Sequence, residues 1–253
     1  MVMIPKIAVF DSGLGSLSVI LPIQKRINAE IIYFADQKNY PYGTKTVSQL
    51  DKIIKYTISK LQEKFSPDVI VVGSNTPSLL LDIEKKDKIF GVYPPLKEAA
   101  SKTRSGKIGI LATRTVVKNK TLDKYIKKNV TKKIHVTKID ATPLVDLVES
   151  GRFISQKQAS KYTIQKIINP HVEDGIDTFT LSSTHLPFLV PILKELFPGV
   201  TFLDPADTVA KHIAKILKHR SKRSRLKIYA SGDINAFQEQ LKKMGIKNKV
   251  NSL

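Results

Sequence analysis

The chain contains no cysteine at all. This absence excludes disulfide bonds, thiolate metal sites and thiol nucleophiles. The five histidines form no HxH or HExxH pair, so the sequence predicts no metal site. No apolar run approaches the roughly 20 residues of a membrane-spanning helix. The N-terminus lacks the pattern of a signal peptide, and we therefore expect a cytoplasmic protein that does not associate with membranes.

Acidic residues are scarce relative to basic ones, and the formal net charge is +20. The surplus is concentrated in residues 101–253, with dense basic runs beginning at Lys118 and Lys218. Such a field attracts nucleic acids and acidic metabolites. The second run has no aromatic residue on which bases would stack. We therefore favour a solvated basic surface with weak, non-specific nucleic-acid binding, and keep a basic nucleic-acid-binding module as an alternative.

Short apolar segments alternate with helix-like segments along the whole chain, which is typical of an α/β protein with parallel sheets covered on both faces. The predicted strands are Lys6–Phe10, Glu30–Ala35, Val69–Gly73, Ile89–Val92, Lys107–Ala112, Ile134–Ile139, Thr178–Ser182, Thr201–Leu203 and Lys227–Ala230. The principal predicted helices are Thr46–Lys64, Pro95–Arg104, Lys118–Lys128, Ser155–Asn169 and Pro205–Lys218.

Two proline-marked crossings, near Gly91–Pro95 and around Asp204–Pro205, predict two α/β domains, each with a mainly parallel sheet. The first is predicted to be discontinuous, with residues 1–94 plus 207–253, and the second to hold residues 95–206.

Polar residues follow several predicted strands at once. Asp11 and Ser12 follow the first strand, Ser74 to Thr76 follow the third, and Thr184 and His185 follow the seventh. Any one of these groups is explained by helix capping, a turn or a satisfied histidine. Their occurrence together at the carboxyl ends of strands, where open α/β sheets bind ligands, favours a ligand cleft. The helices beginning there offer backbone N–H groups to a carboxylate.

Five segments, in order, resemble the motifs of glutamate racemases. They are DSGLGS from Asp11, YFADQKNYPYGTKT from Tyr33, GSNTPS from Gly73, TPLVDLVESGRF from Thr142 and LSSTHLPFL from Leu181. The resemblance implies two α/β domains that face each other across a cleft for a glutamate-sized ligand. It also implies cofactor-independent amino-acid racemisation, in which one cysteine removes the α-proton and another returns a proton to the opposite face. A homodimer is common in that family.

Carried over position by position, the resemblance assigns a role to eleven residues of this chain. Ser74 and Ser183 stand where the family has its two catalytic cysteines. Asp11 and His185 are the polar partners of these two positions, and Glu149 supports His185. The positions that hold the dicarboxylic amino acid are Ser12, Tyr42, Gly43, Asn75, Thr76 and Thr184.

The two serines depart from the family in their acidity. A thiol has a pKa of about 8.5 that its surroundings lower further, whereas a serine hydroxyl is a far weaker acid. A general base works best with a pKa near the operating pH, so these serines are poor bases for an α-proton. We therefore predict a pseudoenzyme that keeps an amino-acid pocket and has little or no racemase activity.

Three alternatives stay open at this point: an active racemase with atypical serines, a deliberately inactivated protein, and new serine chemistry. Further departures favour natural divergence, because Pro77, Ser182 and Leu186 also differ from the usual Ala, Gly and Tyr. No Gly-x-Ser-x-Gly elbow surrounds either serine, which speaks against a serine hydrolase.

Overall fold

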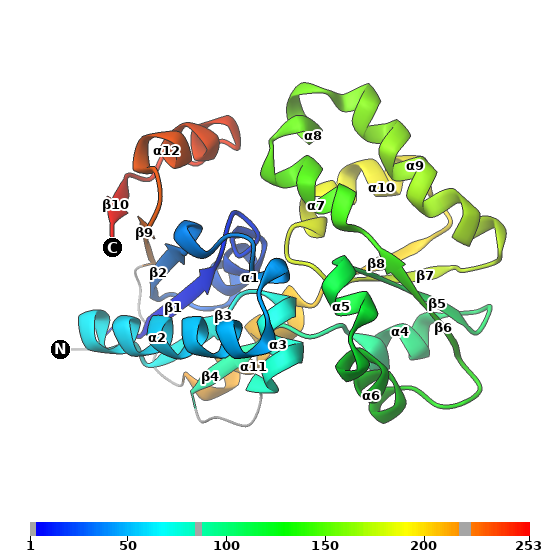
Figure 1. Ribbon diagram of the computed structural model, residues 1–253, viewed down its shortest axis with the longest axis horizontal. Helices are drawn as coiled ribbons and strands as arrows, with labels where there is room; N and C mark the ends of the chain where they lie inside the picture. The colour runs from blue at the N-terminus through cyan, green and yellow to red at the C-terminus, as the bar shows by residue number, and fades with distance from the viewer. Residues whose placement is uncertain (1–3, 84–87, 218–223) are drawn as a thin grey trace. The chain divides into compact units, whose positions relative to one another are not determined.

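The computed structural model describes residues 4–83, 88–217 and 224–253 and shows two compact units (Figure 1). Unit 1 comprises Met1–Val92 and Ala206–Leu253, and unit 2 comprises Tyr93–Pro205. The interpretation of these units as separate domains, with limits at 1–94 plus 207–253 and 95–206, stays a prediction.

Unit 1 is built on a six-stranded sheet with the order β10-β9-β2-β1-β3-β4, in which every neighbouring pair is parallel. Its strands are β1 (Lys6–Asp11), β2 (Glu30–Ala35), β3 (Val69–Val72), β4 (Ile89–Gly91), β9 (Arg225–Ala230) and β10 (Val250–Ser252). Its helices are α1 (Leu17–Arg26), η1 (Gln37–Asn39), η2 (Tyr42–Thr44), α2 (Val47–Phe65), α3 (Asn75–Leu81), α11 (Ala206–Ile216) and α12 (Ile234–Lys243).

Unit 2 has a four-stranded parallel sheet with the order β6-β5-β7-β8. Its strands are β5 (Lys107–Ala112), β6 (His135–Asp140), β7 (Thr178–Leu181) and β8 (Thr201–Leu203). Its helices are α4 (Leu96–Lys102), α5 (Arg114–Lys118), α6 (Lys120–Asn129), α7 (Thr142–Glu149), α8 (Arg152–Ser155), α9 (Lys157–Glu173), η4 (Leu186–Leu189) and α10 (Val190–Leu196).

The α/β class with two parallel sheets is confirmed. Every predicted strand lies within or beside an observed one, and the structure adds β10 at the end of the chain. The basic run that begins at Lys218 falls largely on residues 218–223, which lie outside the described residues.

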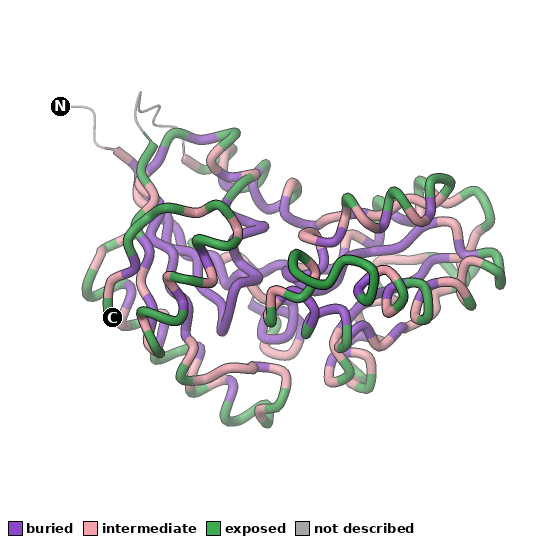
Figure 2. Tube along the Cα trace, turned by 90° about the horizontal axis from the view of Figure 1, so that it is seen from above, coloured by how far each residue is buried: buried purple, intermediate pink, exposed green. Residues whose placement is uncertain are grey.

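Helices cover both faces of the unit 1 sheet. Successive side chains of a strand point to opposite faces, so each strand contributes apolar side chains to the contacts on both sides. Ala8 and Phe10 of β1 pack in one cluster with Leu50 and Ile54 of α2. In a separate contact, the ring of Tyr33 in β2 packs against the ring of Phe237 in α12, with centroids 6.3 Å apart. Strands β1, β2, β3, β5 and β7 are buried along almost their whole length, and the buried stretches of both units are purple in Figure 2. Because the sheet is buried on both faces, ligand-accessible polar groups are expected mainly at the strand ends.

The core of unit 2 gathers around β5 and β7. Leu111, Phe179 and Leu181 pack with Leu144 and Val148 of α7 in one buried cluster. The ring of Phe179 stacks on Phe202 of β8, with centroids 5.5 Å apart. This packing fixes the end of β7, where the second predicted group of site residues begins.

Candidate functional site

The first group of site residues lies at the carboxyl ends of β1 and β3. These strands are adjacent and in register, with Phe10 opposite Val72. Asp11 and Ser12 therefore lie beside the Gly73–Ser74 turn. Both are almost fully buried, and the Ser12 backbone N–H donates to Asp11 Oδ1 at 2.6 Å. The fixed Asp11 carboxylate is a group that suits an ammonium.

Gly73 is required by a close approach in this turn. A Cβ placed on Gly73 would lie 2.4 Å from Ser16 Oγ and 2.9 Å from Ser16 Cβ. The backbone of Gly73 is already bonded to the carbonyl of Phe10 at 2.8 Å. The loop before α1 and the Ser74 turn therefore pack directly against each other, and only glycine fits between them.

We expect Gly73→Ala to lower the free energy of unfolding by roughly 1–3 kcal/mol, because the added methyl group overpacks this contact. Thermal and urea unfolding would measure the change. The double variant Gly73→Ala/Ser16→Gly removes both clashing Ser16 atoms and should regain most of the loss. A double variant as unstable as the single one would contradict this explanation.

Ser74 immediately precedes α3, at the position of its N-cap, and its side chain makes no capping bond. The start of α3 is tied to the segment after β4 by two side chains. Asn75 Nδ2 donates to the Val92 carbonyl at 3.0 Å, and the Val92 N–H donates to Ser78 Oγ at 2.9 Å. Thr76 is also buried in this first turn. Ser74 thus lies at a helix start that two hydrogen bonds hold in place, and its hydroxyl does not cap α3.

Asn75 Oδ1 is buried and accepts no hydrogen bond from the described residues. A buried acceptor without a donor costs about 1–3 kcal/mol, so a native structure seldom leaves one without a reason. An N–H or O–H group of a bound ligand would satisfy this atom.

Tyr42 is held in place by a carboxylate that sequence reasoning did not single out. Its hydroxyl donates to Asp36 Oδ2 at 3.0 Å, and Asp36 is also bonded by Asn39 Nδ2 and by Ser231 Oγ. Burial, followed by the negative charges of Asp36 and Asp11, raises the pKa of Tyr42 well above 10.0. Tyr42 is therefore a neutral hydrogen-bond donor, and the adjacent Gly43 lies in the same 3₁₀ turn, η2. The sequence offered one sign of this role, because Asp36 is an acidic residue directly after the strand that ends in YFA.

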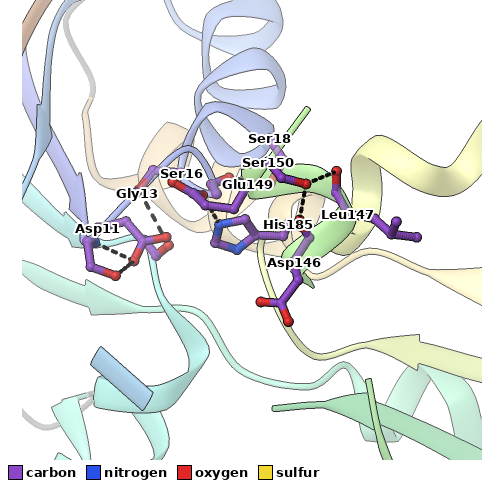
Figure 3. A network of polar contacts seen from close by, with 12 residues as sticks. Asp11, Gly13, Ser16, Ser18, Asp146, Leu147, Glu149, Ser150 and His185 are labelled. Atoms are coloured by element: carbon purple, nitrogen blue, oxygen red, sulfur yellow. Dashed lines mark hydrogen bonds and ion pairs between the residues drawn. The ribbon is translucent and has the colours of Figure 1, made fainter. Parts of the chain in front are cut away.

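The second group of site residues lies in unit 2, directly after β7. Ser183, Thr184 and His185 are all buried. His185 Nε2 is 2.7 Å from Oε2 of Glu149, the last residue of α7, and Figure 3 shows this pair. This contact orients the imidazole ring by holding Nε2 against the Glu149 carboxylate. The support of His185 by Glu149 thus has a structural basis within this unit.

Ser182 and Leu186, two of the departures from the family pattern, are both buried within unit 2. Ser182 Oγ lies 2.9 Å from Thr180 Oγ1, and Leu186 is completely buried in the core cluster. Both side chains are therefore part of the packing of unit 2 next to Ser183.

The structure thus assembles the predicted residues into two groups, one on each unit. Asp11, Ser12, Ser74, Asn75 and Thr76 share neighbouring strand ends of unit 1, with Tyr42 and Gly43 in the loop after β2. Ser183, Thr184, His185 and Glu149 share one end of the unit 2 sheet. That Ser74 and Ser183 face each other across a cleft stays a prediction. Among the described residues, no cluster of three or more His, Cys, Asp or Glu is placed to hold a metal ion.

The sequence is similar to those of known glutamate racemases along most of its length. A glutamate racemase of Roseiflexus sp. is 32% identical over 221 residues, which cover 85% of this chain and 80% of the relative. The chain belongs to the glutamate racemase family. No protein-family model matches the sequence.

Solved structures of glutamate racemases share the fold. A Bacillus anthracis isoform has a TM-score of 0.85 at 24% identity and covers 98% of this chain and 97% of that one. The Escherichia coli enzyme, in complex with L-glutamate and the activator UDP-MurNAc-ala, has a TM-score of 0.83 at 26% identity. It covers 99% of this chain and 98% of that one. This family member nevertheless has no cysteine. No helix in the described part of the chain is long and apolar enough to cross a membrane.

Proposed function

We propose that this protein is a glutamate racemase-like pseudoenzyme that binds a dicarboxylic amino acid and catalyses little or no racemisation. The proposal rests on one observation: at the strand ends, residues suited to holding an amino acid occur together with serines at the two proton-carrier positions. The ligand-holding residue types are all present, and hydrogen bonds hold Asn75 and His185 in place, whereas serine occupies both proton-carrier positions.

The amino-acid pocket is supported by the chemistry of the two groups. Asp11 offers a carboxylate to the ammonium, and the buried Oδ1 of Asn75 offers an acceptor that the described residues leave unused. The hydroxyls of Ser12, Thr76 and Thr184 are proposed donors for carboxylates, and Tyr42, whose hydroxyl donates to Asp36, shapes the loop beside them. The Escherichia coli relative was solved with L-glutamate, which supports glutamate or aspartate as the ligand class.

The loss of catalysis is supported by the acidity of the two hydroxyls. His185 is bonded to Glu149 and follows Ser183 by two residues, so a histidine lies close in the sequence to only one of the two serines. Racemisation requires a proton carrier on each face of the α-carbon. The active racemase with atypical Ser74 and Ser183 is the alternative that a rate measurement decides.

We expect calorimetric titration to detect binding of at least one enantiomer of glutamate or aspartate. Asn75→Ala should weaken that binding at least tenfold, because the ligand then loses its acceptor in the pocket. Ser78→Ala is the matched control, since Ser78 also contacts Val92 from α3 but is not a proposed ligand contact. It should change the affinity by less than about threefold. If neither enantiomer of glutamate and neither enantiomer of aspartate binds, the proposed pocket is contradicted.

The family resemblance also supports a homodimer in the cytoplasm, which light scattering and cell fractionation would test. Nucleic-acid binding is proposed to be weak and non-specific, with a steep fall as salt rises. Tight, sequence-selective binding at physiological salt would instead favour the nucleic-acid-binding module.

A further inference from the structure

A basic pocket lies on unit 1, between α1 and α11. It has a volume of about 450 Å³, within the range of small-molecule sites. The last turn of α1 and the exposed face of α11 form its walls. The polar residues that line it are Lys25, Arg26, Thr208, Lys211, His212 and Lys215.

The sequence of α11 explains why these side chains converge. Its buried face packs into unit 1 through Val209, Ala210 and Ile213. Residues three, four and seven positions apart share one face of a helix, so Thr208, Lys211 and Lys215 form one row along the opposite face. The end of α1 brings two further cations to this row.

Asp207 fixes half of the cationic groups. It is bonded to Arg26 Nε at 3.0 Å and to Lys211 Nζ at 2.9 Å, so it ties the end of α1 to the start of α11. Hydrogen bonds from Lys211 and then from Arg26 lower the pKa of Asp207, which keeps it ionised near neutral pH. Arg26 and Lys211 are therefore held at the pocket before any ligand arrives.

The other two cations lack compensation. Lys25 and Lys215 are exposed, and neither forms an ion pair with any residue in ranges 4–83, 88–217 and 224–253. Four cationic side chains and one carboxylate leave a net charge of +3 around one concave surface. Lysines scattered on an exposed helix are ordinarily just solvated. Here, in contrast, the cations come from two helices and surround one pocket. The aliphatic stems of these side chains form part of its walls.

We propose that this pocket binds a small anion carrying two or more phosphate groups. A single phosphate group carries roughly −2 at neutral pH, which is less than the local surplus. A carboxylate carries still less. Lysine acts as a point charge toward phosphate, arginine adds a bidentate fork, and Thr208 supplies a hydroxyl donor. The site is separate from the strand-end groups and does not depend on the proposed amino-acid pocket.

The test is calorimetric titration of the whole chain at low salt with inorganic triphosphate, and with orthophosphate for comparison. Triphosphate should bind at least tenfold more tightly than orthophosphate. Lys25→Gln/Lys215→Gln should weaken triphosphate binding at least tenfold, equivalent to ~1.4 kcal/mol. The matched control Lys52→Gln/Lys247→Gln removes the same charge from exposed positions of unit 1 outside the pocket and should weaken it by less than about twofold.

Equal losses in the two double variants would show diffuse attraction to a basic protein and overturn the proposal. Equal affinity for orthophosphate and triphosphate, or no measurable binding, would also overturn it, as would binding of a DNA oligonucleotide without triphosphate binding. Titration with a nucleoside triphosphate tests whether the ligand is a nucleotide or a phosphate chain without a nucleoside. Tighter binding than inorganic triphosphate assigns a nucleotide, and equal binding assigns the phosphate chain alone.

Discussion

Restoring both thiols, with Ser74→Cys and Ser183→Cys in one protein, is expected to raise glutamate racemisation at least about 10²-fold over the unmodified chain. General acid–base catalysis typically contributes 10²–10⁴-fold, and a thiol is a far better proton carrier near neutral pH than a hydroxyl. Each single variant should gain less than about a tenth of this, because the other face of the α-carbon still lacks a carrier. Deuterium exchange at the α-carbon, run with each enantiomer, measures both cases.

A matched control introduces the same number of thiols away from the strand ends. Ser48→Cys and Ser155→Cys place one exposed cysteine on each unit and should give no gain. Pro77, Ser182 and Leu186 will limit the recovery, since the last two are locked into the interior of unit 2. Rapid exchange by the unmodified protein would show that serine or another base performs the reaction, and would favour the active-racemase alternative.

Asp36→Ala is expected to lower the free energy of unfolding by about 3 kcal/mol, the largest effect on stability that we predict from a single polar side chain. The Asp36 carboxylate is almost fully buried and accepts from Tyr42, Asn39 and Ser231, which come from two distant parts of the chain. Its removal leaves these donors without their acceptor. Urea unfolding followed by circular dichroism measures the change.

Two variants calibrate this prediction. Tyr42→Phe removes one donor and should cost only about 1 kcal/mol. Asp51→Ala breaks an exposed ion pair with Lys55 and should cost about 0–1 kcal/mol. A loss for Asp36→Ala no greater than for Asp51→Ala would show that the Asp36 contacts contribute little to stability.

The sequence predicted the features that depend on local pattern. The apolar segments located both sheets, and the polar residues after them located both groups of site residues, because the end of a strand is visible in the chain itself. Glu149 and His185 lie on different elements, and only the family resemblance related them. The structure supplies their 2.7 Å contact.

Contacts that depend on register between distant segments were not predictable. Ser231 bonds to Asp36 only because β9 pairs with β2 in a register that places Ala230 opposite Ala35. The contact of Ser16 with Gly73 likewise depends on β1 and β3 being adjacent. The basic pocket required knowing that α1 packs on α11, although their sequences are separated by most of the chain.

The interrupted path of the chain through unit 1 has a consequence for synthesis. Residues 93–205 are continuous, so unit 2 has its whole sheet available while the ribosome is still translating the remainder. The six-stranded sheet of unit 1, in contrast, lacks β9 and β10 until residues 225–252 have been translated, and until then β2 has no partner on that side. An apolar strand with an open edge is a template for aggregation. The nascent protein therefore presents Glu30–Ala35 as an unprotected edge until Arg225–Ala230 has been synthesised.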